Sequence, residues 1–272
     1  MVRLTRTVRC SVGAGRPMTP GAAGTPSAGR NGYAGWPRSA GLARFYELDV
    51  SVEGDVEPVT GYFLNIQEVD RIVRETAIPF IDQACGRSPE REPAELLPSV
   101  ARAMAPALAG RLASLRWRVT PTYSVELESD QMNRVVMRQR FEFAASHRLH
   151  CPTLSDEENR RLFGKCNSPN GHGHNYVVEP AVAVRLNPAG PPSFTLEALE
   201  RLTGEAVIAR FDHKHLNEDT REFATIGGVN PSVENIARVC FDLLAPAIRE
   251  AGAELASVTV WETEKTSATY PA

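Results

Sequence analysis

The sequence is short of the features that mark several large classes of protein. Its net charge is −3, so there is no excess of positive charge to favour nucleic-acid binding. No apolar run approaches the roughly 20 residues that span a bilayer, which argues against a membrane protein. The five cysteines are odd in number and scattered, with no CxxC pair. That pattern argues against a disulfide framework and favours a reducing compartment, the cytoplasm.

Acidic residues are missing from the amino terminus before Glu47, while seven arginines lie in the same stretch. An arginine-rich, acid-poor start is typical of organelle transit peptides. Residues 2–12 alternate apolar and polar side chains, however, as a half-buried strand does, and a Gly/Pro/Ala-rich loop follows from Gly13 to Gly41. We predict a strand and a loop, because this stretch has a counterpart later in the chain.

The 272 residues suit one large domain or two of average size, and 42% hydrophobic residues supply a core. The same order of predicted elements occurs twice: strand, loop, strand, helix, irregular segment, helix, strand, strand. Three pairs of segments match in the same order, namely 44–52 with 174–182, 78–83 with 208–213, and 113–119 with 256–262. We therefore predict two repeats, residues 1–130 and 135–272, joined at a short polar stretch.

Regular apolar spacing predicts the helices. The clearest stripe follows Ser232, a plausible N-cap, and consists of Ile236, Val239, Cys240, Leu243 and Leu244. Each repeat is predicted to be an α+β unit, a four-stranded antiparallel sheet with two helices on one face. A lone sheet of this size keeps exposed edges, so we expect edge-to-edge pairing in a homo-oligomer.

All six histidines lie between His147 and His215. His172 and His174 are at i and i+2 in a predicted strand, so they share one face. His147, at the end of the predicted strand 141–147, brings a third ring. Three protein ligands with a vacant fourth position describe a catalytic zinc site, whereas structural zinc normally has four. We predict metal-assisted chemistry.

A cysteine lies six residues before this pair of histidines. The turn-rich loop between them allows Cys166 to bend back over the metal. A nearby Zn²⁺ and Lys165 would favour the reactive thiolate. Most free cysteines are small buried hydrophobes, and we assign that role to the other four.

Four further acidic or imidazole groups are candidates for proton transfer or substrate binding. Asp212 next to His213 fits an orienting carboxylate beside a proton carrier. Glu234 and Glu262 are candidate anchors for a polar substrate. For Glu234 there is a simpler interpretation, because an acid in the first turn of a helix is favourable without a ligand.

The first repeat lacks all of these groups. Where the second has His172, His174, His213 and Glu262, the first has about Leu42, Arg44, Gln83 and Val119, and His147 corresponds to about Ala14. The apolar framework is retained. We interpret the first repeat as a structural copy without chemistry of its own.

From His147 to Glu262 the sequence resembles the 6-pyruvoyl-tetrahydropterin synthase family. The segments that carry the resemblance are SHRL at 146–149, LSDEENRRLFGKCN at 154–167, PNGHGHNY at 169–176, FDHKHLN at 211–217, SVEN at 232–235 and WET at 261–263. The block from the cysteine to the paired histidines is the most specific. The first repeat resembles the family only in its framework.

The resemblance implies a tunnelling fold, in which units close into a barrel as trimers and two barrels stack. It implies a lyase that converts 7,8-dihydroneopterin triphosphate to 6-pyruvoyl-tetrahydropterin and releases triphosphate. Zinc would be held by His147, His172 and His174, with Cys166 as general base. Asp212 and His213 would form a proton relay that reaches in from a neighbouring subunit, while Glu234 and Glu262 would meet the pterin and Glu262 would also join the relay.

The duplication adds an expectation about assembly. Three chains would build one barrel of active copies stacked on one of inert copies. One departure from the family is the segment 185–193, where relatives have a hairpin tip, and it should alter an edge contact and not the metal site.

Two other functions remain open. One is 6-carboxy-tetrahydropterin synthase of the deazapurine pathway, which shares the fold and the zinc ligands but typically has a shorter loop between the cysteine and the histidines. The other is a non-catalytic pterin-binding or assembly protein.

Overall fold

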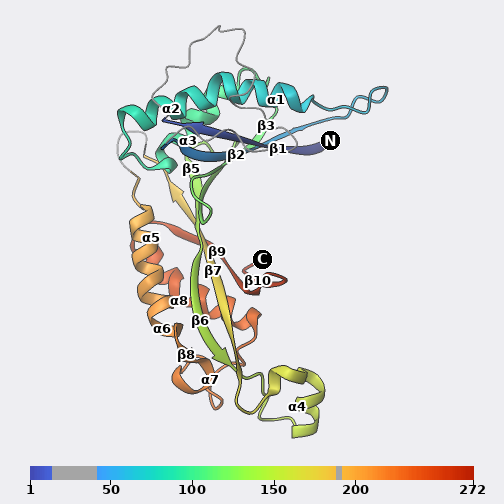
Figure 1. Cartoon of the computed structure of the whole chain (residues 1–272), viewed down its shortest axis with the longest axis vertical. Helices are drawn as coiled ribbons and strands as arrows, with labels where there is room; N and C mark the ends of the chain where they lie inside the picture. Colours follow the sequence, from blue (N-terminus) through green and yellow to red (C-terminus); the bar gives the residue numbers. More distant parts are fainter. Residues whose placement is uncertain (14–41, 188–191) are drawn as a thin grey trace. The chain divides into compact units, whose positions relative to one another are not determined.

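The computed structural model describes residues 1–13, 42–187 and 192–272. Most of the loop expected from Gly13 to Gly41, including Ala14, lies outside the described residues, as does the centre of the segment 185–193. Internal contacts divide the chain into two compact units, which are coloured from blue to red along the sequence in Figure 1. Unit 1 comprises Met1–Met137 with Arg185–Pro192, and unit 2 comprises Arg138–Val184 with Ser193–Ala272.

Four strands of unit 1 pair in sequence order, each antiparallel to the next. They are β1 (Val2–Val12), β2 (Arg44–Gly54), β3 (Leu112–Arg118) and β4 (Tyr123–Glu128). The strand predicted over residues 2–12 is confirmed. Burial alternates along β4, so one face of this sheet is apolar and the other is polar.

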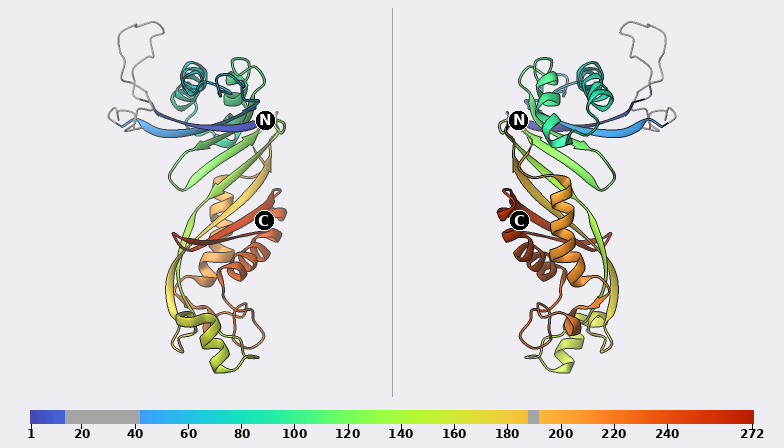
Figure 2. Two further views of the ribbon diagram at one scale, coloured as in Figure 1. Left: turned by 90° about the vertical axis from the view of Figure 1, so that its right-hand side faces the viewer. Right: turned by 90° about the vertical axis from the view of Figure 1, so that its left-hand side faces the viewer.

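Two helical segments cover the apolar face of the unit 1 sheet (Figure 2). The first is continuous and consists of α1 (Ile66–Ile72), a π-helical turn η1 (Val73–Ala77) and α2 (Ile78–Arg87); the second is α3 (Pro93–Met104). Asn65 caps the first helix by accepting a hydrogen bond from the backbone N–H of Gln67. Ile72, Ile81 and Leu97 are fully buried against the sheet side chains.

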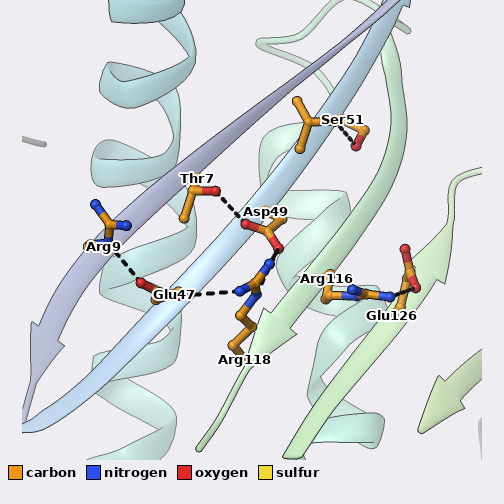
Figure 3. Close-up of polar contacts among 9 residues, drawn as sticks. Thr7, Arg9, Glu47, Asp49, Ser51, Arg116, Arg118 and Glu126 are labelled. Carbon is orange, nitrogen blue, oxygen red and sulfur yellow. Dashed lines mark hydrogen bonds and ion pairs between the residues drawn. The ribbon is translucent and has the colours of Figure 1, made fainter. Parts of the chain in front are cut away.

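The opposite face of this sheet carries paired polar side chains, which we call the polar lattice (Figure 3). Its members are Thr5, Thr7, Arg9, Glu47, Asp49, Ser51, Arg116, Arg118 and Glu126. Asp49 accepts hydrogen bonds from Thr7 Oγ1 at 2.6 Å and from Arg118 Nε at 2.9 Å. Arg9 pairs with Glu47 at 2.7 Å and Arg116 with Glu126 at 2.8 Å. Each charged member therefore has an opposite charge on a neighbouring strand.

In unit 2 the strands run in the order β8-β6-β7-β9-β10. Their bounds are β6 (Phe141–His147), β7 (His172–Arg185), β8 (Lys214–His215), β9 (Glu254–Thr263) and β10 (Thr266–Tyr270). Pairing is antiparallel except between β8 and β6, which are parallel. The remaining strand, β5 (Arg134–Gln139), crosses the boundary between the units.

The helices of unit 2 follow a similar order, with additions between β6 and β7 and between α6 and α8. They are α4 (Asp156–Phe163), a 3₁₀ turn η2 (Gly164–Asn167), α5 (Leu196–Thr203), a π-helical turn η3 (Gly204–Ile208), α6 (Ala209–Phe211), α7 (Leu216–Asp219) and α8 (Val233–Glu250). The predicted N-cap is confirmed, since Ser232 accepts from the N–H of Asn235. The class is α+β, as expected; the architecture of two tunnelling-fold units stays a prediction.

Aromatic packing forms the core of unit 2 beneath β6 and β7. The rings of Phe143 and Tyr176 stack with centroids 5.1 Å apart, and Phe211 packs against Phe143. Ile236, Cys240 and Leu244 of α8 are fully buried, as their spacing predicted. Within the described ranges, no helix has the length and apolar content that a bilayer crossing requires.

Candidate functional site

The antiparallel pairing of β6 with β7 brings the three predicted histidines together. His147 is the direct cross-strand partner of His172, and His174 lies two residues further along β7 on the same face. Nε2 of His147 is 3.2 Å from Nε2 of His172. One ligand nitrogen from each of the three rings lies within 4.8 Å of the others. The structure therefore gathers three nitrogens around one point.

This arrangement fits a zinc ion. With Zn–N distances of 2.0–2.1 Å, two ligands of a tetrahedral ion are about 3.3 Å apart, close to the spacing of the first two rings. Nε2 of His174 is buried and has no hydrogen-bond partner among the described residues. A buried nitrogen of this kind is expected where an ion takes the place of a hydrogen bond. A tetrahedral ion held by these three nitrogens would keep its fourth position open.

The surroundings of His147 set its tautomer. The ring is fully buried, and Nδ1 lies 2.7 Å from the backbone carbonyl oxygen of Pro231. Because a carbonyl only accepts, Nδ1 must carry the proton, and the lone pair of Nε2 faces the other two rings. Burial lowers the pKa of His147 to about 4, and burial also lowers the pKa of His172. Both rings are therefore kept neutral, the form that binds a metal.

Cys166 lies on η2, between α4 and β7, and is half-buried. Its carbonyl oxygen accepts a hydrogen bond of 2.8 Å from the N–H of Leu149, two residues after the first candidate ligand. Burial raises the pKa of the Tyr176 hydroxyl, and negative charge on Glu262 and on Cys166 raises it further. That hydroxyl is 3.3 Å from Nδ1 of His147. The backbone hydrogen bond therefore ties the Cys166 segment to the residues that follow His147.

A glycine shapes the end of the loop that carries Cys166. Gly171 has a φ of +67°, and a Cβ there would come 2.7 Å from Nε2 of His215 and 2.9 Å from the carbonyl oxygen of His147. Only glycine adopts this backbone beside such close neighbours without displacing them. The turn into β7 therefore depends on this residue.

Asp212 and His213 form a hydrogen-bonded pair at the edge of β6. Asp212 Oδ2 lies 2.9 Å from His213 Nδ1, and Oδ1 accepts a hydrogen bond of 2.9 Å from the N–H of Ala144. The N–H of Ala144 and the imidazole together hold the pKa of this carboxyl below its ordinary value. The side chain of His213 is 83% exposed, so its Nε2 is available to a molecule outside the unit.

The backbone at His213 is unusual. Its φ is +56°, in the left-handed region that residues other than glycine rarely adopt, and its N–H donates to the carbonyl of Ala144 at 2.6 Å. The residue borders a cavity of about 440 Å³ that His174 also borders. Strained residues of this kind cluster at functional sites. The geometry therefore presents an oriented imidazole at the rim of a pocket beside the trio.

The two predicted glutamates differ in their surroundings. Glu262 on β9 places Oε1 3.6 Å from Nε2 of His174, with 18% of its side chain exposed. Glu234 lies in the first turn of α8 and is exposed, where it is favourable to the helix without a ligand. The structure therefore brings Glu262 to the trio, and the role of Glu234 stays a prediction.

Sequence reasoning missed three groups around the trio. Tyr176 contacts His147, and it could have been found because it lies two residues after His174 on the same face of a strand. His215, for which the sequence indicated no pairing partner, is close enough for its charge to lower the pKa of His147. The carbonyl of Pro231 had no signal in the sequence, since every residue has a carbonyl.

Comparisons with known proteins concern the second half of the chain. The family model described as 6-pyruvoyl tetrahydropterin synthase matches residues 136–272. The 6-pyruvoyl tetrahydrobiopterin synthase of Homo sapiens is 41% identical over 132 residues, which are 48% of this chain and 88% of the human protein. That of Drosophila melanogaster is 36% identical over 135 residues, 49% of this chain and 77% of the relative. The solved structure of the Caenorhabditis elegans 6-pyruvoyl tetrahydropterin synthase is 34% identical, covers 50% of this chain and 94% of that one, and has a TM-score of 0.46.

Proposed function

This chain belongs to the 6-pyruvoyl tetrahydropterin synthase family and is a lyase of that type, and from this premise we propose its reaction and its metal. Unit 2 converts 7,8-dihydroneopterin triphosphate to 6-pyruvoyl-tetrahydropterin and releases triphosphate. The reaction takes place at a zinc ion held by His147, His172 and His174. The observation that supports the proposal is the convergence of one nitrogen from each of three imidazole rings, all within 4.8 Å of one another.

Each group of the site has a task that its surroundings support. Zinc, when bound, acts as a Lewis acid on the hydroxyl oxygens of the substrate side chain. Cys166, as thiolate, removes a proton from a side-chain carbon, and triphosphate leaves from the neighbouring carbon with its bonding electrons. His213 exchanges a proton on the other side, and Asp212 holds its ring through Nδ1.

The overall change needs no redox cofactor. A proton leaves one carbon during elimination, and another returns during tautomerisation, so an acid and a base must act on the same substrate. Glu262, 3.6 Å from His174, binds the donor groups of the pterin ring beside the metal and joins the relay, and Glu234 contributes a second carboxylate to the ring.

We propose that unit 1 is a degenerate copy of unit 2 without a metal site. Each unit has a long helical segment interrupted by a π-helical turn, η1 in one and η3 in the other. After this turn each has a carboxylate that accepts a hydrogen bond from a backbone N–H: Asp82 from Gly13, which directly follows β1, and Asp212 from Ala144 of β6. Shared irregularities of this kind support a duplication more strongly than shared regular elements, because π turns are rare.

The exposure of His213 supports an assembly in which it serves a site on a neighbouring chain. We propose a homotrimer in which three copies of unit 2 form one barrel and three copies of unit 1 form a second barrel stacked on it. Mass photometry should give a particle of about three times the 29.7 kDa chain, or a multiple of that. A stable monomer with full turnover would contradict the proposal.

One assay tests the reaction. Purified protein loaded with zinc is incubated with 7,8-dihydroneopterin triphosphate, and products are identified by mass spectrometry. We expect 6-pyruvoyl-tetrahydropterin and triphosphate in equal amounts. Release of acetaldehyde with a carboxylated pterin would identify a 6-carboxy-tetrahydropterin synthase instead. Tight pterin binding with no product would identify a binding protein.

A further inference from the structure

An irregular segment, residues 148–151, directly follows His147 at the end of β6. It belongs to no helix or strand, so its backbone N–H groups need partners from elsewhere. Leu149 N donates to the carbonyl of Cys166, and the other three N–H groups donate to asparagine side chains. The pairs are Arg148 with Asn217 at 2.8 Å, His150 with Asn230 at 3.1 Å, and Cys151 with Asn159 at 2.7 Å.

A fourth asparagine, Asn167, holds the Cys166 loop against this segment. Its Nδ2 donates to the carbonyl of Leu149 at 2.6 Å, and its Oδ1 accepts from the Arg148 guanidinium at 3.4 Å. The N–H of Leu149 in turn donates to the carbonyl of Cys166 at 2.8 Å. Both sides of Leu149 are thus tied to neighbouring residues of the loop. Since Asn167 is only 6% exposed, water does not compete effectively for these bonds.

Asn217 ties the His213 segment to the same place. It lies on α7, four residues after His213, and its amide makes two bonds to one residue. Oδ1 accepts from the N–H of Arg148 at 2.8 Å, and Nδ2 donates to the carbonyl of Arg148 at 3.0 Å. The amide side chain therefore makes the two backbone hydrogen bonds to Arg148 that a neighbouring strand would otherwise make.

Asn230 connects the start of α8. Its Oδ1 accepts from the N–H of His150, and its own carbonyl accepts from Asn235 Nδ2 at 2.8 Å. Asn235 is the neighbour of Glu234 in the first helical turn. The residue after Asn230 is Pro231, whose carbonyl orients His147.

We propose that Asn167, Asn217 and Asn230 are positioning residues that set the candidate catalytic segments in register with the metal ligand His147. Each belongs to a different segment, and these segments carry Cys166, His213 and Glu234 respectively. All three act through residues 148–151. The inference rests on the proposed function for its catalytic consequence, but the mechanical link stands on the hydrogen bonds alone.

Asparagine is suited to this task because its side-chain amide has both a donor and an acceptor, like a peptide group. Aspartate keeps the acceptor and loses the donor, and alanine loses both. Substitution of Asn167 leaves the carbonyl of Leu149 without its donor, so the Cys166 loop can shift. A displacement of about 1 Å at a reacting group is enough to lower turnover about 100-fold.

The test compares Asn167→Ala with Asn159→Ala. Asn159 is fully buried and bonds both the N–H and the carbonyl of Cys151, at 2.7 and 2.9 Å, so it is an equally buried clamp on the same segment. It comes from α4, which carries no candidate functional residue. We expect Asn167→Ala to lower kcat about 100-fold with KM and zinc content unchanged. Asn159→Ala should lose stability but keep kcat per bound zinc.

Two further readouts do not depend on turnover. In metal-free protein, Asn167→Ala should speed the hydrogen exchange of the Leu149 amide and change the rate at which Cys166 is alkylated, measured by mass spectrometry of its peptide. Asn159→Ala should leave both unchanged. If the protein proves to have no lyase activity, these readouts still decide whether the link exists, so failure of the function and failure of the link are distinguishable.

Equal kcat and equal exchange in the two folded variants would overturn the inference, and so would a proportionate loss of kcat in both. If Asn167→Ala does not fold, Asn217→Ala makes the same comparison at the His213 segment. There we expect a lower kcat and a changed pH profile of kcat. An unchanged profile in folded protein would refute the positioning role.

Discussion

The two units treat their polar side chains in opposite ways. In the polar lattice of unit 1, Asp49 and Arg118 satisfy one another, with a second hydrogen bond from Thr7. In unit 2, the nitrogens of three histidines converge, and Nε2 of His174 has no hydrogen-bond partner in the described part of the chain. Charged side chains that are paired with one another have little capacity left to bind a ligand. A buried nitrogen without a hydrogen bond, in contrast, indicates that a ligand is needed to satisfy it.

A pair of corresponding tyrosines shows the same contrast. Tyr46 on β2 packs edge-on against Trp117, and its hydroxyl lies 3.9 Å from Cys85 Sγ. Tyr176 on β7 packs against Phe143, and its hydroxyl lies 3.3 Å from a candidate metal ligand. Similar aromatic packing therefore supports an ordinary core in unit 1 and the candidate metal site in unit 2. Residue identity at a few positions, more than the framework, separates the two.

The largest expected effect comes from removing a candidate metal ligand in unit 2. His172→Ala removes one of three ligands, so zinc content should fall to near zero. Because a metal contributes several kcal/mol to stabilising the transition state, activity should fall at least about 1,000-fold. Metal content is measured by mass spectrometry of the digested protein. Asp49→Ala in unit 1 is the control and should retain zinc; retention of zinc by His172→Ala would disprove the ligand assignment.

The second effect distinguishes loss of the proposed general base from loss of the metal. Cys166→Ala should keep zinc and fold while turnover falls about 10²- to 10⁴-fold, the range typical of general-base catalysis. Cys151→Ala is the matched control, because this half-buried residue has its thiol pKa lowered by hydrogen bonds with Thr153 and its sulfur has no part in the proposed reaction. Equal turnover in the Cys166 variant and wild type would remove the thiol from the mechanism.

The same substitution at Asp212 in unit 2 and at Asp82 in unit 1 should affect turnover differently. Asp212→Asn should lower turnover about 10- to 100-fold, because the imidazole loses its orienting charge. Asp82→Asn in unit 1 should leave turnover unchanged, although Asp82 also accepts a backbone N–H. Because the pKa of Asp212 is lowered, its carboxylate stays ionised near neutral pH, so its titration should not appear in that part of the profile of kcat. Equal losses in the two variants would show that the effect is structural.

The smallest effect concerns the polar lattice itself. Asp49→Ala removes the acceptor for Thr7 and Arg118, which should lower the free energy of unfolding by about 1–3 kcal/mol. Urea denaturation measures this change. Turnover and zinc content per folded chain should not change, because unit 1 contributes no ligand. A loss of turnover at unchanged stability would give unit 1 a catalytic role.

Periodicity in the sequence predicted the parts of the fold that depend on local spacing. The alternation over residues 2–12 identified β1, and the spacing of His172 and His174 placed both rings on one face. The helix α4 was missed, although Ser155 and Glu158 form a capping box that a search for this signature would have found.

The parts that could not be predicted depend on contacts between residues distant in the sequence. Asn217 and Arg148 are 69 positions apart, and neither has an unusual sequence context. The parallel pairing of the two-residue strand β8 with β6 is too short to give a periodic signal. The π turns also gave no signal in the sequence, because they depend on packing around the helix and not on composition.

The left-handed backbone at His213 bears on how the protein could be re-engineered. A glycine there would relieve conformational cost, so His213→Gly should unfold at a slightly higher temperature, with a gain below about 1 kcal/mol. Selection of variants for thermal stability alone would favour this substitution, and the imidazole would be lost. Screens of this chain should therefore measure turnover as well as thermal stability, because we expect glycine at position 213 to raise the stability and lower the turnover.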